Sequence, residues 1–195
     1  MLIKIIFGFM DREENKMDKV VFFKNDNYRT DYCCGQIYYD FLDYAFSQTD
    51  FFMLVYSNKK KKGYSSIMRH FKDALRQYKV KSRTNASWAG TLGRIDPVYD
   101  YTVIFYRTDP AAKEILKEVD RLSAWSCPSY PEDLSFFKGN QCWAYSVGHE
   151  IIQGIIHANK QDIDFVVKHG LADYSDVTPY DSFYDDFDEI LIKNS

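Results

Sequence analysis

The chain has 195 residues, of which 46% are hydrophobic and 27% are charged, and its formal net charge is −3. This length suits one domain of about 100–200 residues, and such a chain can bury a core without disulfide bonds or metal ions. Aromatic residues are unusually frequent, at 17% of the chain. Most of them should pack in the core because Tyr and Phe bury large areas, and surplus Tyr can line a ligand or partner surface.

The chain has four cysteines: Cys33, Cys34, Cys127 and Cys142. No CxxC pair occurs, and adjacent cysteines rarely bridge each other, so the spacing excludes a secreted disulfide framework and a zinc knuckle. We therefore interpret the cysteines as small core residues of a protein in a reducing cytoplasm. The sequence indicates neither a cofactor nor a metal ion.

The chain begins with the apolar run MLIKIIFGFM. This run is too short to cross a bilayer, which takes about 20 residues. The acidic stretch DREEN follows it in place of a cleavage site. We interpret residues 1–16 as either an edge strand or an N-terminal extension, and we expect no membrane among the partners.

The first half of the chain alternates between strand and helix patterns. Residues 19–24 and 51–56 are runs of β-branched, aromatic and other apolar residues, which are typical of buried strands. Between them, Thr30 or Asp31 can cap a helix that continues to about residue 45 with an apolar residue at every fourth position.

The next helix has the clearest pattern in the chain. Apolar residues between positions 67 and 78 recur at helical spacing and form one stripe. Four cations form a second stripe on about the opposite side of the same helix: Arg69, Lys72, Arg76 and Lys79. Residues 82–97 are rich in turn residues and predict a loop.

The second half begins with a third predicted strand at residues 101–107. Asp109 and Pro110 then cap and start a helix, and a further short helix begins at Pro131. Residues 141–147 and 151–157 predict two strands joined at a turn. Asn159 and Asp162 form a capping box for a last helix that stops at Gly170.

The predicted order is therefore β-α-β-α-β-α-α-β-β-α. It indicates a single α/β domain in residues 17–170, with α+β as the alternative class. We expect a mixed sheet of about five strands with flanking helices, because alternation implies parallel or mixed pairing and the late hairpin adds an antiparallel edge. Residues 171–195 are interpreted as an acidic C-terminal tail.

The middle of the chain is strongly basic: residues 59–94 contain eleven Lys or Arg and one acid, a local net charge of +10. Its lysine run lies between a predicted strand end and a helix N-terminus, where free N–H groups and the helix dipole favour anions. The P-loop pattern GxxxxGK[ST] is absent, and a solvated surface is the alternative. The candidate anion-binding residues are Lys59, Lys60, Lys61, Lys62, Ser65, Arg69, Lys72, Arg76, Lys79, Arg83, Trp88 and Arg94.

Trp88 lies in a predicted loop of small residues, SWAGT. The ring either anchors this loop on the core or forms part of a ligand platform. With Arg83 and Arg94 it would suit a base or sugar stacked beside phosphates.

Residues 161–195 contain nine acids and two lysines, a net charge of −7, with Phe183, Tyr184 and Phe187 interleaved among the acids. We favour the interpretation that this segment folds back onto the basic face and neutralises it. The alternatives are a docking segment for another protein, from Asp173 to Ser195, or a mimic of nucleic-acid phosphate.

The four histidines are His70, His149, His157 and His169. No HExxH motif occurs, and a metal site needs three or four converging ligands. Nucleophilic catalysis would need Cys142, Cys34 or a Ser beside one of these bases, which only proximity in space can decide. We assign no catalytic residue and no metal ligand.

Four segments carry a resemblance: NDNYRTDYCCGQIYYDFLDYAFSQTDFFMLVYSN, YSSIMRHFKDALRQYKVKSRTN, SCPSYPEDLSFFK and CWAYSVGHE. They resemble a family of short proteins from Bacillus-like bacteria and their mobile elements, often labelled stage III sporulation protein AH. The resemblance covers about residues 17–171, which is most of the chain. It implies no catalytic residues.

The sequence supports three functional hypotheses. The preferred one is a non-catalytic binding or regulatory protein that holds a nucleotide or nucleic acid on the basic loop and helix. The second is an inhibitor or regulator, carried by a mobile element or directed against host defence, that binds a protein through residues 173–195. The third is a small hydrolase-type enzyme for an anionic substrate.

Overall fold

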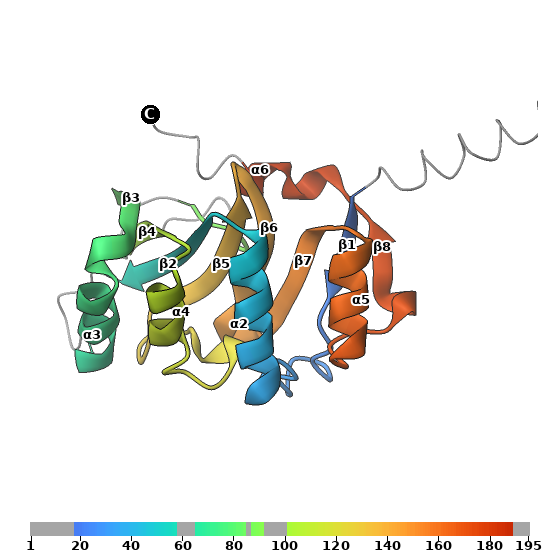
Figure 1. The fold of residues 1–195 in the computed structure, drawn as a ribbon, viewed down its shortest axis with the longest axis horizontal. Helices are drawn as coiled ribbons and strands as arrows, with labels where there is room; N and C mark the ends of the chain where they lie inside the picture. Colours follow the sequence, from blue (N-terminus) through green and yellow to red (C-terminus); the bar gives the residue numbers. More distant parts are fainter. Residues whose placement is uncertain (1–17, 58–64, 85–86, 92–100, 189–195) are drawn as a thin grey trace, which may run out of the picture.

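The structure is a computed structural model and describes residues 18–57, 65–84, 87–91 and 101–188 (Figure 1). One sheet of eight strands crosses it in the order β3-β4-β2-β5-β6-β7-β1-β8. The strands are β1 (Lys19–Phe22), β2 (Phe51–Ser57), β3 (Lys79–Thr84), β4 (Tyr101–Arg107), β5 (Glu132–Lys138), β6 (Gln141–Val147), β7 (Ile152–Ala158) and β8 (Val177–Pro179). The α-helices are α2 (Gln36–Gln48), α3 (Ser66–Ala74), α4 (Pro110–Leu116), α5 (Lys160–Lys168) and α6 (Asp185–Asp188).

Short 3₁₀ turns connect several of these elements: η1 (Arg76–Tyr78), η2 (Leu122–Ala124), η3 (Gly148–Glu150), η4 (Tyr174–Asp176) and η5 (Ser182–Tyr184). The combination of helices with one sheet confirms the α/β class. No helix in the described ranges is long and apolar enough to cross a bilayer. The predicted extension at residues 1–16 lies outside the described residues.

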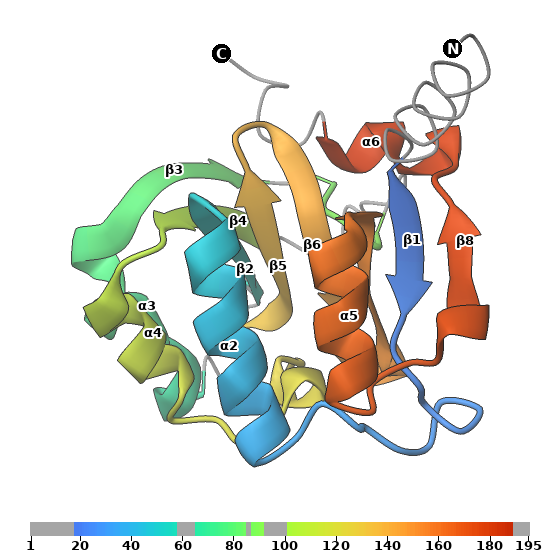
Figure 2. The same cartoon turned by 45° about the vertical axis from the view of Figure 1, so that its right-hand side comes forward.

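Helices α2, α3, α4 and α5 cover one face of the sheet (Figures 1 and 2). The core on that face joins Phe41 of α2 and Phe71 of α3 to alternate residues of the strands, and Trp125 is fully buried within it. The opposite face of the sheet forms a second core, which the loop at Trp88 and helix α6, through Phe187, cover in part. The many aromatic residues thus fill two layers, one on each side of the sheet.

The strand pairings differ from the prediction, because all those between described strands are antiparallel. The crossovers through α2 and α3 still join strands that run in the same direction, since β1, β2 and β3 are separated by odd numbers of antiparallel neighbours. Strand β4 lies between β2 and β3, and β5, β6 and β7 lie between β2 and β1. The predicted parallel or mixed pairing is wrong because later strands insert between those that the helices connect.

The predicted number of about five strands is also wrong. All five predicted strands are present, and β3, β5 and β8 are added to them. Strand β3 takes residues assigned to the basic helix, β5 takes those assigned to a short helix after Pro131, and β8 lies in the predicted tail. Strand β5 pairs with β2 and strand β8 pairs with β1, both far away in the sequence. Strand β3 pairs with β4, which follows it after a loop.

Two local expectations also need correction. Helix α2 begins after Gly35 without a side-chain cap, whereas Asp31 accepts hydrogen bonds from the amides of Cys33, at 2.8 Å, and Ser123, at 2.7 Å. The C-terminal segment is not an irregular tail, because Leu171 is buried and β8 pairs with β1. The folded unit therefore extends beyond Gly170.

Candidate functional site

Helix α3 positions the first of the predicted anion-binding residues. Ser65 caps it, because its Oγ accepts a hydrogen bond of 3.0 Å from the Met68 amide and donates one of 2.7 Å to the Ser129 carbonyl. The helix buries Met68 and Phe71 against the core, so Arg69 is left exposed to solvent. The predicted role of Ser65 as a ligand donor is thus replaced, in the described structure, by the role of a helix cap.

The continuous cationic stripe predicted along one helix does not form. Helix α3 ends at Ala74, Arg76 belongs to the turn η1, and Lys79 is the first residue of strand β3. The chain then pairs with β4 as strand β3, with a bulge between Lys79 and Lys81 and a register that pairs Arg83 with Val103. The cations are therefore distributed over a helix, a turn and a strand.

Strand β3 forms one edge of the sheet and presents cations at alternate positions. Lys81 pairs with Phe105 and Arg83 with Val103, so both side chains lie on the face opposite the helices. The Arg83 guanidinium lies 5.5 Å from the centre of the Phe105 ring, and burial lowers its pKa. We call the described surface of α3, η1 and β3, with Arg69, Lys72, Arg76, Lys79, Lys81 and Arg83, the basic end.

Two cations of this region were not among the predicted site residues. Lys81 lies on β3 between Lys79 and Arg83, and Arg107 ends the neighbouring strand β4, with its guanidinium 5.8 Å from the ring of Tyr78. Cations at every second position, 79, 81 and 83, are typical of a strand, and this spacing was the signal that could have assigned Lys81 to β3. On the helix, Lys72 lies close to the aromatic core, with Nζ 5.6 Å from the ring of Tyr56.

Five of the predicted residues, Lys59, Lys60, Lys61, Lys62 and Arg94, lie outside the described residues. The residues that flank their segments are neighbours in the sheet. Ser57 at the end of β2 pairs with Tyr101 at the start of β4, and Thr84 at the end of β3 pairs with Thr102. The segments that carry these five cations are therefore joined in the chain to the end of β2 and the start of β4, and β4 is the neighbour of β3.

Trp88 is an anchor of the core. Its side chain is 4% exposed, lies 5.1 Å from the ring of Tyr101, and donates a hydrogen bond of 2.6 Å from Nε1 to Oδ2 of Asp133. A ring in this position does not present a face for stacking on a base. The first of the two predicted roles of Trp88, anchoring its loop, is therefore the one that the structure shows.

Asp133 is fully buried, and its other oxygen accepts a hydrogen bond of 3.0 Å from the Gly148 amide. Burial raises the pKa of this carboxyl to about 7, against the opposing effect of its two hydrogen-bond donors. Its backbone is left-handed, with a φ of 59°. Asp133 thus joins three segments, the Trp88 loop, the start of β5 and the turn η3, and the sequence contained no signal for it beyond an acid after a proline.

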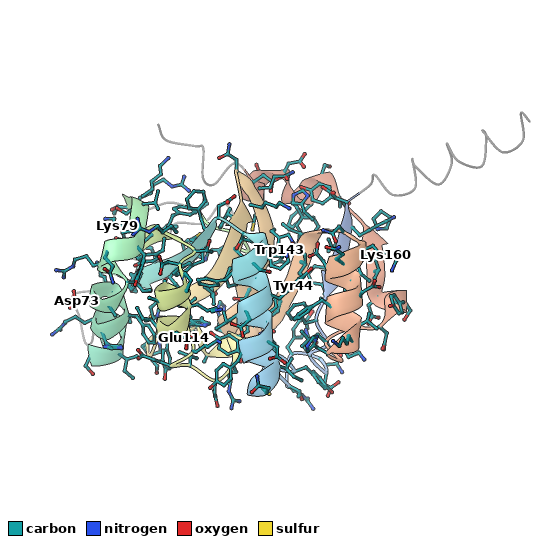
Figure 3. The ribbon with its side chains drawn as sticks, in the orientation of Figure 1. Tyr44, Asp73, Lys79, Glu114, Trp143 and Lys160 are labelled. Atoms are coloured by element: carbon teal, nitrogen blue, oxygen red, sulfur yellow. The ribbon has the colours of Figure 1, made fainter. Side chains whose placement is uncertain are left out.

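The acidic C-terminal segment begins at the opposite edge of the sheet from the basic end and returns as far as β6, on which α6 packs. It forms η4, the edge strand β8, η5 and α6, and Figure 1 shows these elements away from β3. Figure 3 likewise shows Lys79 of β3 and Lys160 of α5, the helix that precedes this segment, at opposite ends of the molecule. We call the surface of η4, β8, η5 and α6, with Asp173, Asp176, Asp181, Asp185, Asp186 and Asp188, the acidic end.

The contacts of the acidic end are local. Asp173 pairs with Lys24 at 3.0 Å, and Asp188 contacts His157 at 3.0 Å and accepts from the Cys142 amide at 2.9 Å. Phe187 packs against Tyr145, with ring centres 5.1 Å apart. The favoured prediction, that this segment covers and neutralises the basic face, is therefore wrong for its described residues.

The histidines do not form a nucleophile–base pair in the described structure. His70 contacts Glu118 at 2.7 Å, His149 lies 3.6 Å from Glu150, His157 bonds to two aspartates, and His169 contacts the Phe165 carbonyl at 2.8 Å. Burial raises the pKa of the Cys33 and Cys142 thiols well above the usual value, which disfavours the reactive thiolate. Among the described residues, no group of three or more His, Cys, Asp or Glu side chains is arranged so that it could hold a metal ion.

Comparison with protein-family models, with curated proteins and with solved structures finds no match to this chain. The resemblance to the family labelled stage III sporulation protein AH therefore stays a prediction. The basic end is the candidate functional site that the geometry of the chain itself supports.

Proposed function

We propose that this protein binds an anionic ligand at the basic end, and that the ligand is a nucleic acid. One observation supports the proposal above the others: the exposed cations Arg69, Arg76 and Lys79 lie on three successive elements at one edge of the sheet, while the described acids of the C-terminal segment lie between β6 and the other edge strand, β8. Asp73 of α3 pairs with Arg76, so the basic end is predominantly rather than uniformly positive. A surface with such an excess of one sign attracts a charged partner from a distance.

The distribution of the cations favours a polymer over a single nucleotide. They follow a helix, a turn and an extended strand, on which Lys81 and Arg83 share one face about 7 Å apart. A bulge before Lys81 places Lys79 opposite Tyr106, on the other face. Such a line of charges matches the repeated phosphates of a nucleic-acid backbone, which supply most of the affinity in binding without sequence preference. Trp88 is buried, so base stacking on this ring is not part of the proposal.

Lysines on β3 have a second physical effect, because charged side chains on an edge strand hinder pairing with another chain. Protection of the edge needs only charge of either sign, whereas binding of a polyanion needs positive charge. The two roles therefore predict different results when the sign of the charge is reversed.

The test is a titration of fluorescein-labelled single-stranded and duplex DNA and RNA of 20 nucleotides, followed by fluorescence anisotropy at several salt concentrations. For about four phosphate contacts to a single strand, the slope of log K against log salt is about −3, so affinity falls about 50-fold between 50 and 200 mM salt. Absence of binding at 50 mM salt, or affinity that does not change with salt, would refute the proposal. Binding of mononucleotides as tight as that of the polymers would exclude the polymer as the ligand.

A further inference from the structure

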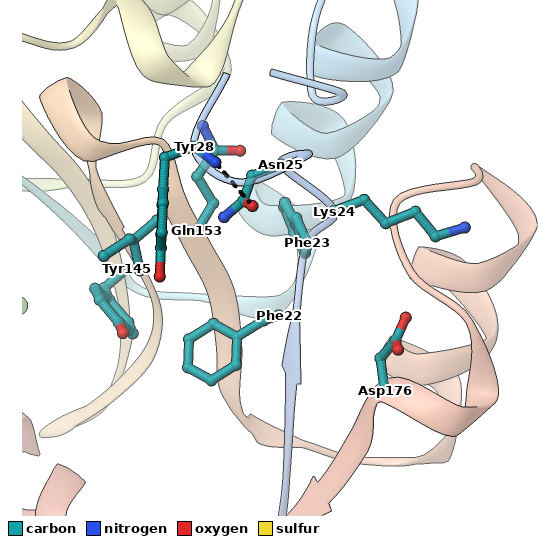
Figure 4. Close-up of a pocket in the computed structure, with 9 residues that line it drawn as sticks. Phe22, Phe23, Lys24, Asn25, Tyr28, Tyr145, Gln153 and Asp176 are labelled. Carbon is teal, nitrogen blue, oxygen red and sulfur yellow. Dashed lines mark hydrogen bonds between the residues drawn. The ribbon is translucent and has the colours of Figure 1, made fainter. Parts of the chain in front are cut away.

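A cavity of about 600 Å³ opens beside the end of β1, on the side of the sheet that includes β8 rather than β3 (Figure 4). Its walls come from the end of β1 and the loop after it, from β6, from the start of β7 and from η4. This volume is within the range of about 300–1,000 Å³ that is common for ligand pockets. The cavity is separate from the basic end, and a ligand can occupy it whether or not the basic end binds a nucleic acid.

Three aromatic residues form one part of the cavity wall: Phe22, Tyr28 and Tyr145. The rings of Phe22 and Tyr145 meet edge to face, with centres 6.4 Å apart. Figure 4 shows the Tyr28 ring on the same side of β1 as these two rings. The face of an aromatic ring carries partial negative charge, so a group of rings around a cavity attracts cations.

Tyr145 also offers a hydroxyl group to a ligand. The residue is 7% exposed, and its hydroxyl has no hydrogen-bond partner within the described part of the chain. Burial raises the pKa of Tyr145, so the hydroxyl stays neutral at physiological pH. An N–H group of a bound cation would supply the donor that this oxygen lacks.

The charged residues of the lining are Lys24 and Asp176, which Figure 4 shows on the other side of β1 from the rings. Lys24 pairs with Asp173 at 3.0 Å, so its charge is offset. Asp176 accepts a hydrogen bond of 2.8 Å from the Asp173 amide through one oxygen. With Asp173, which lies outside the lining, the three charges Lys24, Asp173 and Asp176 sum to −1. A cation is therefore favoured over an anion at this cavity.

The backbone around the cavity is held in unfavourable conformations. Asp26, Asn27 and Tyr28 are all left-handed, with φ values of 44°, 58° and 65°, and Ile151 beside the cavity has a φ of 53°. Asp and Asn adopt such values at little cost, but Tyr28 does so less readily, and the β-branched Ile151 is strained. The left-handed backbone does not bury Tyr28 in the core, because this residue is 62% exposed.

One side chain holds both left-handed segments. Asn25 accepts a hydrogen bond of 3.2 Å from the Tyr28 amide through Oδ1, and it donates one of 3.2 Å from Nδ2 to the Ile151 carbonyl. The same residue thus fixes the loop that carries Tyr28 and the start of β7 on the other side of the cavity. Strain that is maintained around a cavity, without a gain in core packing, is typical of binding sites.

We propose that this cavity binds the cationic side chain of an arginine or lysine of a protein partner. The aliphatic stem of such a side chain packs against the rings, and its N–H groups donate to the Tyr145 hydroxyl. The Asp176 carboxylate, on the other side of β1, contributes negative charge at longer range. The exposed carboxylate of Asp173 lies next to Asp176 and suits a partner surface that is basic around this side chain.

The experiment is an NMR titration of the full-length, ¹⁵N-labelled protein with four peptides, acetyl-Gly-X-Gly-amide, in which X is arginine, lysine, citrulline or glutamate. We expect saturable shifts of the Tyr28, Gln153 and Asp176 amides with the arginine and lysine peptides. Citrulline has the shape of arginine without its charge, so it should bind at least about tenfold more weakly. Equal binding of the citrulline peptide, or no saturable shift of these amides with any peptide, would overturn the proposal.

Matched variants separate the cavity from its surroundings. Tyr28→Ala should weaken the arginine peptide about tenfold and Tyr28→Phe should preserve its binding, whereas Tyr174→Ala, at an equally exposed tyrosine outside the lining, should have no effect. Asp176→Asn should weaken binding, and Asp181→Asn should not. Free arginine amide carries the same guanidinium group without a peptide chain, so it tests whether the ligand is a small molecule. Saturation by arginine amide but not by the arginine peptide would reject a protein side chain as the ligand.

Discussion

Nε1 of Trp88 donates a hydrogen bond of 2.6 Å to Oδ2 of Asp133, and this contact joins the loop after the basic strand β3 to the centre of the sheet. The same carboxylate accepts from the Gly148 amide, so a single buried acid holds three segments together. Because the indole and the amide can only donate, the pair selects an acceptor at position 133. Both the stability of the protein and its pH dependence should therefore reflect this contact.

The stability of the protein should fall as the pH rises from about 4 to about 7. The pKa of Asp133 is about 7 in the folded protein and about 3.9 in the unfolded chain, so the folded state binds more protons in this range. The free energy of unfolding then decreases by up to about 1.4 kcal/mol for each pH unit, and this contribution is constant above pH 7. Urea unfolding at intervals from pH 4.5 to pH 8 measures the slope.

The variant Asp133→Asn assigns this slope to one residue. Asparagine does not titrate, so the variant should remove the contribution of residue 133 to the pH slope. At pH 5 it should also lower the free energy of unfolding by about 1–3 kcal/mol, because the side-chain NH₂ group faces a donor, either Trp88 Nε1 or the Gly148 amide, and cannot accept its hydrogen bond. Glu114→Gln, at a largely exposed acid, is the control and should leave the slope unchanged. An unchanged slope in Asp133→Asn would assign the pH dependence elsewhere.

Replacing Trp88 by Phe should destabilise the protein more than replacing Trp143 by Phe. Both indoles are almost fully buried, but only that of Trp88 donates a hydrogen bond to a buried carboxylate among the described contacts. The extra loss should be about 1–3 kcal/mol, since Oδ2 of Asp133 is left without a donor. Equal losses in the two variants, measured by urea unfolding, would show that the hydrogen bond contributes nothing beyond ring packing.

His157 should hold the acidic end on the sheet in a manner that weakens as the pH rises. Burial lowers the pKa of His157, but its hydrogen bonds to Asp188 and Asp18 outweigh this effect and raise the pKa above its usual value. The protonated ring also stacks on Tyr180, with ring centres 4.4 Å apart. The contribution of His157 to the free energy of unfolding is fully present below the pKa of the unfolded histidine, about 6.5. It is lost as the pH rises through the higher pKa that His157 has in the folded protein.

Hydrogen exchange of the Cys142 amide reports this contact locally, because that amide donates to Asp188. In His157→Gln we expect faster exchange of this amide at pH 6, with little change in the amides of α2. His70→Gln is the control, since His70 pairs with Glu118 at an exposed site. If exchange of the Cys142 amide is the same in His157→Gln and the parent protein, α6 is held by Phe187 alone.

Reversing charge at the basic end should abolish nucleic-acid binding without unfolding the protein. The triple variant Arg69→Glu, Arg76→Glu and Lys79→Glu changes three exposed residues, so the core is unaffected. Affinity for a single-stranded 20-mer at 50 mM salt should fall by at least about tenfold, because three phosphate contacts are lost and repulsion replaces them.

The control for this variant has the same net charge. Arg29→Glu, Lys138→Glu and Lys168→Glu also alter three exposed cations, but these residues are not on α3, η1 or β3. Affinity should change little in this second variant. Equal losses in both would show that binding depends on net charge and not on the basic end.

Local sequence patterns predicted those elements whose signals lie within a few neighbouring residues. The capping box of Asn159 and Asp162 on α5 and the cap of Asp109 before Pro110 on α4 are confirmed. Strands β2 and β4, which are buried apolar runs, were also found. In each case the cap or the hydrophobic period is complete within the segment itself.

The basic strand β3 was missed because two signals conflicted. Leu75 and Tyr78 continue the apolar period of α3 and are buried, yet they lie beyond its last residue, in its C-cap and in a 3₁₀ turn. What ends the helix is the pairing of β3 with β4, about twenty residues later in the chain. The hydrophobic period within residues 67–78 contains no information about hydrogen bonds that β4 provides.

The candidate site shows the same division. The sequence by itself determined which residues are charged, the opposite signs of the middle and the end of the chain, and most of the strands, because these depend on composition and short-range periodicity. Only the tertiary structure decided that the basic residues gather at the β3 edge while the acidic segment lies between β6 and β8, that Trp88 is buried on Asp133, and that Phe22, Tyr28 and Tyr145 line a cavity. These relationships arise from strand order, and strand order is set by which long-range pairings bury the most apolar surface.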